Sequence, residues 1–187
     1  GGGFAIPYTR DQQPPSIAKY AEAITSTLIQ GCRDLGFDQP TLVIEPGRAI
    51  VGPAGVAVYT VGARKDIPGV RTYVSVDGGM GDNVRPALYE ARYEAVVANR
   101  VHEAPGERVT IAGKFCESGD ILVRDADLPI MEPGDLVVLP ASGAYCVPMA
   151  SNYNMAARPA IVMVRDGVAR LIRRRETYQD LMAEDVV

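Results

Sequence analysis

The chain has 187 residues, of which 47% are hydrophobic and 22% are charged, and its formal net charge at pH 7 is -4. This length suffices for one well-packed core, or for a β domain joined to part of another domain. The charge balance argues against a nucleic-acid partner, because phosphate binding needs clustered lysines and arginines. No apolar run approaches the roughly 20 residues that span a membrane. Three cysteines without metal-ligand spacing (Cys32, Cys116 and Cys146) favour a reducing, cytoplasmic location.

The first quarter of the chain has the pattern of a loop, a helix and a strand. Apolar residues recur at helical spacing over residues 16–35, with Ser16 placed as the N-cap and Gly36 placed to end the helix. Residues 41–44 (Thr-Leu-Val-Ile) predict a short strand that is buried on both faces. This order is typical of the closing piece of an α/β unit.

After Gly55 the chain breaks into short β-type runs separated by glycine, proline and aspartate. Asp166-Gly167 is a strong signal for a two-residue hairpin turn. Many short strands at this spacing favour a β barrel or sandwich, followed by a helical turn or two over residues 178–183. The predicted strands are residues 56–61, 72–76, 93–101, 109–112, 121–123, 136–139, 161–164 and 168–173.

Two segments of the first quarter could bind an anionic ligand. Gly1, Gly2 and Gly3 lack Cβ atoms, so their amides can approach an anion closely, although such a triplet is as often a tight turn. Glu45-Pro46-Gly47-Arg48 follows the predicted strand, and catalytic groups of α/β barrels project from that end. Its carboxylate and guanidinium could serve one charged, aromatic ligand, or they could form an ion pair within a turn.

Three segments of the β region carry further candidates. Arg85 and Tyr89 are four residues apart, so one helical turn would place both on a single face. Cys116 and Glu117 open a polar, turn-like segment between β runs, which is not the usual setting of a buried, inert cysteine. Tyr145 follows the end of a predicted strand, where an aromatic ring could equally fill the core.

Taken in order, these segments resemble the diaminopimelate decarboxylases, which are enzymes of fold-type III that depend on pyridoxal 5′-phosphate (PLP). The resemblance covers essentially the whole chain and rests on Gly-Gly-Gly-Phe, Glu-Pro-Gly-Arg, Asp-Asn-Val-Arg-Pro-Ala-Leu-Tyr, Cys-Glu-Ser-Gly-Asp and Gly-Ala-Tyr. It implies an α+β fold: residues 1–50 close a PLP-binding α/β (TIM-type) barrel, and residues 51–187 form a C-terminal β domain. Family chains are more than twice this length, so we expect the chain to begin inside a domain.

The resemblance assigns roles to individual residues. It implies a phosphate cradle from the three glycines, a carboxylate that pairs with the pyridine nitrogen, and an arginine near both phosphate and substrate. The implied cofactor-binding residues are Gly1, Gly2, Gly3, Glu45, Pro46, Gly47, Arg48 and Tyr145. The implied substrate contacts are Arg48, Arg85, Tyr89, Glu117 and Tyr145.

Cys116 resembles the family's proton donor to the α-carbon, and its loop is expected to reach into the other subunit of a homodimer. The implied reaction converts meso-2,6-diaminopimelate, a small amino acid, to L-lysine and CO2. That substrate carries a carboxylate and an ammonium at its far end, where arginines and Glu117 can bind them. A decarboxylase for ornithine or arginine meets only a cation there.

None of the three lysines (Lys19, Lys65 and Lys114) matches the context of the family's cofactor-binding lysine, so we expect the chain alone to be inactive. The lone His102 does not match the family's ring-stacking histidine and predicts a surface role. Two alternatives stay open at this point. One is another fold-type III decarboxylase, such as one acting on carboxynorspermidine. The other is a non-catalytic binding or dimerisation module.

Overall fold

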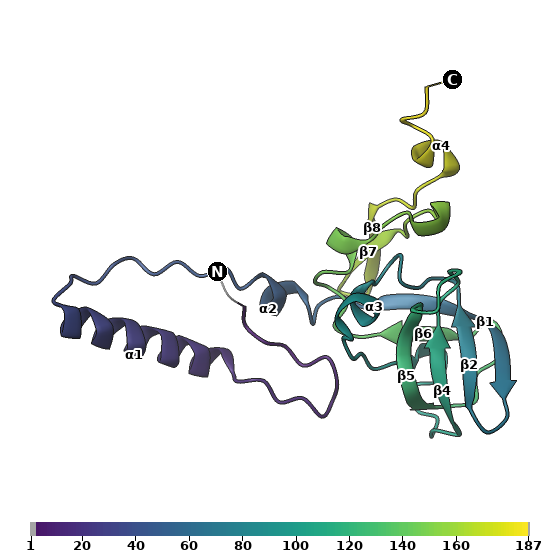
Figure 1. Ribbon diagram of the computed structural model, residues 1–187, viewed down its shortest axis with the longest axis horizontal. Coiled ribbons are helices and arrows are strands. Elements are labelled where there is room, and N and C mark those ends of the chain that lie inside the picture. The colour runs from purple at the N-terminus through teal and green to yellow at the C-terminus, as the bar shows by residue number, and fades with distance from the viewer. Residues whose placement is uncertain (1–2, 187) are drawn as a thin grey trace.

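The computed structural model describes residues 3–186, so Gly1, Gly2 and Val187 lie outside the described residues. An N-terminal arm (residues 3–44) extends from a nearly closed barrel of six strands, and a two-stranded hairpin and a short helix follow at the C-terminal end (Figure 1). No helix within residues 3–186 combines the length and the apolar character needed to cross a membrane. The six-stranded sheet confirms the predicted β barrel.

The arm contains the predicted helix, α1 (Ile17–Leu35), with both predicted caps. The side chain of Ser16 accepts a hydrogen bond from the backbone N–H of Lys19. Gly36 ends the helix in the left-handed conformation (φ 69°), which glycine adopts without the steric cost of a Cβ atom.

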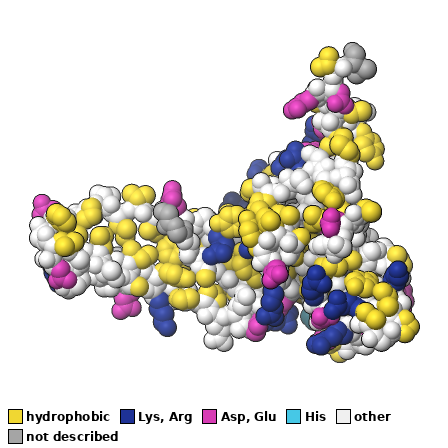
Figure 2. Space-filling view, in the orientation of Figure 1, with side chains coloured by type: hydrophobic (Ala, Val, Ile, Leu, Met, Phe, Trp, Pro, Cys, Tyr) yellow, Lys and Arg dark blue, Asp and Glu magenta, His cyan; other side chains and the backbone are white. Residues whose placement is uncertain are grey.

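The strand predicted at residues 41–44 is wrong for the described chain. These residues belong to neither of the two sheets, and Val43 is 76% exposed. An extended segment becomes a strand only when a neighbour accepts its backbone hydrogen bonds. Figure 2 shows hydrophobic side chains spread over the surface of the arm. Leu35 and Phe37 are among the exposed hydrophobic residues of this segment.

The barrel is one sheet in the order β3-β6-β1-β2-β4-β5, and only the β2–β4 pair is parallel. Its strands are β1 (Ala57–Ile67), β2 (Arg71–Val76), β3 (Val96–Val97), β4 (Glu107–Ala112), β5 (Ile121–Leu128) and β6 (Leu136–Leu139). The remaining α-helices are α2 (Gly47–Val51), α3 (Arg85–Tyr89) and α4 (Tyr178–Leu181). Three short 3-10 helices cover Ala98–Arg100, Val147–Met149 and Tyr153–Met155.

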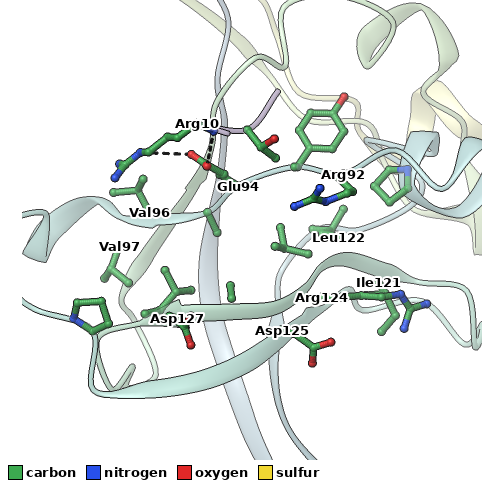
Figure 3. A pocket seen from close by; sticks show the side chains of 18 of the residues that line it. Arg10, Arg92, Glu94, Val96, Val97, Ile121, Leu122, Arg124, Asp125 and Asp127 are labelled. Atoms are coloured by element: carbon green, nitrogen blue, oxygen red, sulfur yellow. Dashed lines mark hydrogen bonds and ion pairs between the residues drawn. The ribbon is translucent and has the colours of Figure 1, made fainter. Parts of the chain in front are cut away.

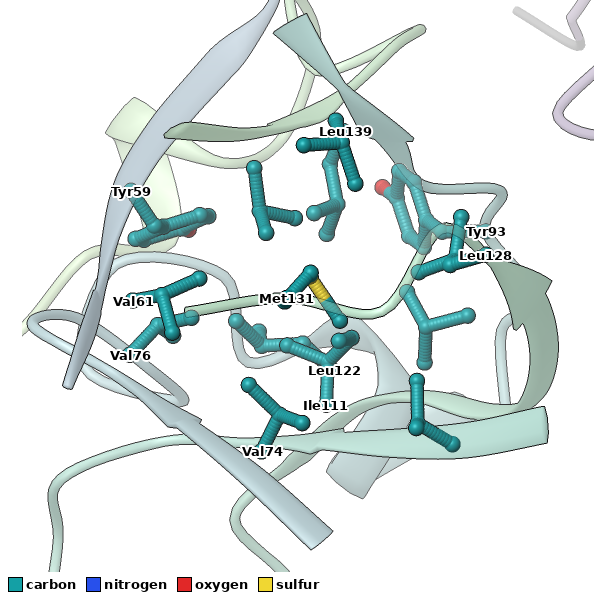
Figure 4. Close-up of a cluster of buried hydrophobic side chains, with 14 residues drawn as sticks. Tyr59, Val61, Val74, Val76, Tyr93, Ile111, Leu122, Leu128, Met131 and Leu139 are labelled. Atoms are coloured by element: carbon teal, nitrogen blue, oxygen red, sulfur yellow. The ribbon is translucent and has the colours of Figure 1, made fainter. Parts of the chain in front are cut away.

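Side chains from all six strands or their connections fill the barrel (Figure 4). Val74, Ile111, Val137 and Leu139 are completely buried. Each aliphatic side chain buried in this way stabilises the fold by about 1.5–3 kcal/mol relative to an exposed one. The core also holds the ring of Tyr93, which is 4% exposed.

Three strands differ substantially from the predicted ones. β5 runs to Leu128 instead of ending at residue 123, because it pairs with β4 as far as Glu107. β1 continues six residues past Val61, after a register shift, because β2 pairs with this polar stretch. The strand predicted at 93–101 is reduced to β3 and a 3-10 turn. Asp135 fixes that turn by accepting hydrogen bonds from the side chains of Asn99 and Arg100, at 2.8 and 2.5 Å.

Helix α2 is docked against the loop that follows β6. The backbone N–H of Ser142 donates to the carbonyl of Gly55, and that of Gly143 donates to the carbonyl of Gly52. A Cβ atom on Gly143 would lie only 1.8 Å from the carbonyl oxygen of Val51. The two backbones can therefore approach this closely only because residue 143 has no side chain.

The C-terminal hairpin pairs β7 (Ile161–Arg165) with β8 (Val168–Arg173). Asp166 and Gly167 both have positive φ (51° and 76°), which is typical of the predicted two-residue turn. Glu176 closes the base of the hairpin, since its carboxylate accepts from Nε and the backbone N–H of Arg158 at 2.6 and 2.8 Å. Asn152 donates to the same carboxylate.

These hydrogen bonds, above all those from the Arg158 side chain, lower the pKa of Glu176 to about 2. The bound form is the carboxylate, so its stabilisation is complete above the ordinary pKa of about 4.5 and is lost as the pH falls towards 2.

We expect backbone amides of β7 and β8 to exchange hydrogen about fivefold faster in Glu176→Gln than in the parent at pH 7. Most of this difference should be lost at pH 2, where about half of the Glu176 carboxylates are protonated. Comparing the two proteins at equal pH cancels the intrinsic pH dependence of exchange. Glu184→Gln, which changes an exposed carboxylate, is the control and should match the parent throughout.

We also expect Gly143→Ala to destabilise the protein by about 1–3 kcal/mol, because the added methyl group must displace the backbone of α2. The midpoint of urea unfolding measures this. Gly31→Ala is the matched control: it adds a methyl group inside α1 with no atom within 4 Å, and should leave the protein equally stable or up to about 1 kcal/mol more stable. Equal midpoints for Gly143→Ala and its parent would contradict the close backbone contact.

Candidate functional site

Arg85, at the start of α3, lies among three tyrosines, two of which (Tyr8 and Tyr145) come from distant parts of the chain. Its Nη1 donates a hydrogen bond to the hydroxyl oxygen of Tyr93 at 2.6 Å. Its guanidinium carbon lies 4.5, 5.6 and 5.8 Å from the ring centroids of Tyr8, Tyr93 and Tyr145. A guanidinium at such distances is attracted by the negative face of an aromatic ring. We call these four residues the Arg85 cluster.

The positive charge of Arg85 has no counter-ion among the described residues, where every recorded ion pair involves other arginines. Burial raises the pKa of Tyr93, so its hydroxyl stays neutral and accepts the hydrogen bond without cancelling the charge. A half-buried guanidinium in this setting is suited to bind a carboxylate by paired hydrogen bonds.

The start of the described chain contacts the Glu-Pro-Gly-Arg segment. Nε of Arg48 donates to the carbonyl of Phe4 at 3.2 Å, and a Cβ atom on Gly3 would lie 3.5 Å from Nη2 of Arg48. Pro46 caps α2 and Gly47 begins it, which leaves Glu45 exposed just ahead of the helix. The predicted anion-binding segments are thus neighbours, as far as they are described. Gly1 and Gly2 lie outside the described residues.

Tyr145 belongs to the loop on which α2 docks. Its backbone is left-handed (φ 64°) and its side chain is 47% exposed. A non-glycine residue with positive φ is uncommon and costs free energy, and such residues cluster at functional sites. Because the same ring also belongs to the Arg85 cluster, Tyr145 links that cluster to the loop that carries α2.

The exposed thiol of Cys116 stands on a loop that a buried carboxylate anchors. Asp120 is 3% exposed and accepts hydrogen bonds from the backbone N–H groups of Met80 (2.6 Å) and Phe115 (2.8 Å). Burial raises the pKa of Asp120, and these hydrogen bonds oppose that effect. Cβ atoms on Gly79 or Gly113 would lie within 2.4 Å of this carboxylate, which explains the glycines around it.

Glu117 stays ionised on the same loop. Its carboxylate accepts from the backbone N–H of Gly119 and from the hydroxyl of Tyr153, both at 3.3 Å. These hydrogen bonds, that of Gly119 first, lower the pKa of Glu117. A fixed, exposed carboxylate beside a thiol suits a cationic ligand.

Helix α3 contacts this loop, since a Cβ atom on Gly119 would lie 3.8 Å from that of Ala87. Arg85 and Tyr89 are the first and last residues of α3. Arg85 is half-buried, whereas Tyr89 is 60% exposed. The structure therefore brings Arg85 and Tyr145 together, brings Gly3 and Arg48 together, and places Cys116 and Glu117 on a separate loop that borders α3.

A large cavity, of about 1010 Å³, is not lined by the predicted site residues. It lies between β5 and the segment that leads into β3, and polar and apolar side chains line it (Figure 3). Two of its cations are paired locally, Arg10 with Glu94 and Arg92 with Asp11. We place the candidate site at the Arg85 cluster, because its cation is half-buried and lacks such a partner among the described residues.

Three residues of the site were not predicted: Tyr8, Tyr93 and the anchoring Asp120. Tyr93 lies eight residues beyond Arg85, across the end of a helix, so no helical or strand period connects them. Tyr8 is even more distant, since it lies near the start of the sequence. Only Asp120 carried a signal, since it ends the Cys-Glu-Ser-Gly-Asp segment.

The lysines occupy unrelated places. Lys19 lies in α1, Lys65 pairs with Tyr73 in the barrel, and Lys114 lies over the ring of Phe115 at 5.7 Å. His102 is exposed in a turn, as expected for a surface histidine.

Comparison with known proteins agrees with the motifs. Residues 17–143 match the family of the pyridoxal-dependent decarboxylase C-terminal sheet domain. The chain is 52% identical to diaminopimelate decarboxylase of Bacillus subtilis (strain 168) over 186 residues, which cover all of this chain and 42% of that relative. A crystal structure of diaminopimelate decarboxylase from M. jannaschii, in complex with L-lysine, superposes with a TM-score of 0.89 and 39% identity. That match covers 99% of this chain and 42% of the other.

A second structure, of diaminopimelate decarboxylase from Helicobacter pylori complexed with L-lysine, has a TM-score of 0.83 and 32% identity. The match covers 97% of this chain and 42% of the Helicobacter pylori chain. The chain therefore spans about two fifths of the length of these relatives. It belongs to the pyridoxal-dependent decarboxylase family and corresponds to the C-terminal part of the diaminopimelate decarboxylases that it matches.

Proposed function

We propose that this chain is the C-terminal part of an enzyme that converts meso-2,6-diaminopimelate to L-lysine and CO2. The observation that carries the proposal is the Arg85 cluster, which presents a guanidinium without a counter-ion among the described residues. Diaminopimelate has a carboxylate and an ammonium at the end remote from the reacting carbon. Ornithine and arginine have only a cation there, and a cation facing Arg85 would be repelled.

The groups near α2 suit PLP. Phosphate esters are bound by N–H donors and guanidinium groups, which the backbone of Gly3 and the side chain of Arg48 supply close to each other. Gly1 and Gly2 would extend this cradle. When bound, PLP accepts the electrons released as CO2 leaves. Glu45 would keep its ring nitrogen protonated, with Pro46 and Gly47 setting the start of α2 and Tyr145 completing the contacts.

Five side chains would hold the substrate. Arg85, assisted by Arg48, would bind the remote carboxylate, and Glu117 would bind the ammonium beside it. Tyr89 and Tyr145 would add contacts to the substrate. The lowered pKa of Glu117 supports this assignment, because an ammonium needs an ionised partner.

Cys116 would donate a proton to the α-carbon after CO2 leaves. The exposure of its thiol supports action on a group outside its own barrel. We therefore propose a homodimer in which the Cys116 loop serves the active site of the other subunit. Residues 1–50 would complete a PLP-binding barrel, and residues 51–187 would form the C-terminal domain. Three unpaired cysteines agree with a cytoplasmic location.

Arg85→Ala tests the proposal in an active enzyme that contains this chain. We expect kcat/KM for meso-diaminopimelate to fall by about 100-fold, because the substrate carboxylate loses its partner. PLP absorbance should be retained. Arg170→Ala, which removes an exposed arginine of β8, is the control and should change neither. Loss of PLP instead of substrate affinity would assign Arg85 to the phosphate site and overturn the substrate assignment.

Cys116→Ala should lower kcat by a factor of about 10² to 10⁴, the usual contribution of a positioned acid, while PLP still binds. Steady-state kinetics and cofactor absorbance measure the two effects. A variant nearly as active as its parent would show that Cys116 has no catalytic part.

Mixing subunits tests the proposed dimer. A Cys116→Ala chain is combined with a chain that lacks the cofactor-binding lysine, and each alone is nearly inactive. If the loop acts on the other subunit, one site of each mixed dimer regains both groups, and roughly a quarter of the parental activity returns. Absence of recovery, despite proven exchange of subunits, would assign Cys116 to its own subunit.

A further inference from the structure

The hydroxyl of Tyr93 is the one hydrogen-bonding partner that the described residues offer to the guanidinium of Arg85. The bond is 2.6 Å long, from Nη1 to the tyrosine oxygen. A guanidinium has five N–H donors in one plane, so fixing one of them limits the directions in which the others point.

Tyr93 is held far more firmly than Arg85. Its side chain is 4% exposed and belongs to the barrel core, and its ring packs edge-on against Tyr8 with centroids 5.3 Å apart. Its hydroxyl also lies 3.9 Å from Sγ of Cys146, another buried group. The tyrosine oxygen is therefore a fixed point of the barrel, and the arginine side chain adjusts to it.

We infer that Tyr93 is a positioning residue that aims Arg85 at the remote carboxylate of the substrate. This inference rests on the proposed function of Arg85. Tyr93 acts through the arginine alone: its hydroxyl holds Nη1, while the ring of Tyr8 supports the face of the guanidinium at 4.5 Å. The remaining donors then have a set direction before the substrate arrives, which lowers the entropy lost on binding.

Tyr93→Phe tests this inference, because it removes only the hydroxyl and keeps the ring in the core. The measurement is the dissociation constant of two probes for the complete, PLP-loaded enzyme. L-lysine has an amino-acid head for Arg85 to bind, whereas cadaverine has the same carbon chain and no carboxylate. We expect Tyr93→Phe to weaken the binding of L-lysine about tenfold, as for loss of one hydrogen bond to a charged group. The binding of cadaverine should be unchanged. KM for diaminopimelate should rise more than kcat falls.

Tyr59→Phe is the matched control. Tyr59 lies in the same core, is 5% exposed, and its buried hydroxyl has no hydrogen-bond partner among the described residues. Its loss should leave the binding of both probes unchanged. Two outcomes would overturn the inference, because each would indicate a general loosening of the core. In one, Tyr59→Phe weakens the binding of L-lysine as much as Tyr93→Phe does. In the other, Tyr93→Phe weakens the binding of both probes equally.

Arg85→Ala separates this inference from the proposed function. If Arg85→Ala leaves L-lysine binding intact, the proposed function fails and the inference fails with it. If Arg85→Ala weakens L-lysine but Tyr93→Phe does not, only the inference fails. Adding Tyr93→Phe to Arg85→Ala should have no further effect on L-lysine, because the hydroxyl acts through the arginine. A full additional loss would show that Tyr93 acts by another route.

Discussion

The contact between the backbone after α2 and the backbone after β6 is the constraint on which the candidate site depends. Two hydrogen bonds join Gly52 and Gly55 to residues 142 and 143, and Gly143 has no side chain to separate them. On one side of this contact α2 carries Arg48, and on the other the chain continues directly to Tyr145. A cofactor site made from both segments requires that neither backbone can move away from the other.

The residues proposed to meet ligands are partly exposed, but the groups that hold them are buried. Tyr93 holds Arg85, and Asp120 holds the loop of Cys116. Burial raises the pKa of both holding groups, and hydrogen bonds oppose that rise, from Arg85 at Tyr93 and from backbone N–H groups at Asp120. The barrel therefore supplies rigidity, and the short helix and loops at its rim carry the residues proposed to act on the substrate.

Charge is distributed to suit a zwitterionic ligand. The positive charge of Arg85 is not compensated, because its described neighbours are neutral rings, and the carboxylate of Glu117 accepts hydrogen bonds that favour its ionised form. Several other arginines pair with carboxylates nearby, among them Arg10 and Arg92 of the large cavity. The absence of such pairing around Arg85 within the described chain is what makes the substrate assignment physically reasonable.

The sequence alone determined those features that depend on neighbours within a few residues. The caps at Ser16 and Gly36 and the turn at Asp166-Gly167 are local, so propensity and steric limits sufficed to predict them. The ordered motifs were also sufficient to suggest the family. The tertiary structure alone decided that residues 41–44 have no strand beside them in the described chain and that β3 has only two residues. It also decided that Tyr8 and Tyr93 meet at Arg85, because closing a barrel joins residues whose separation follows no local period.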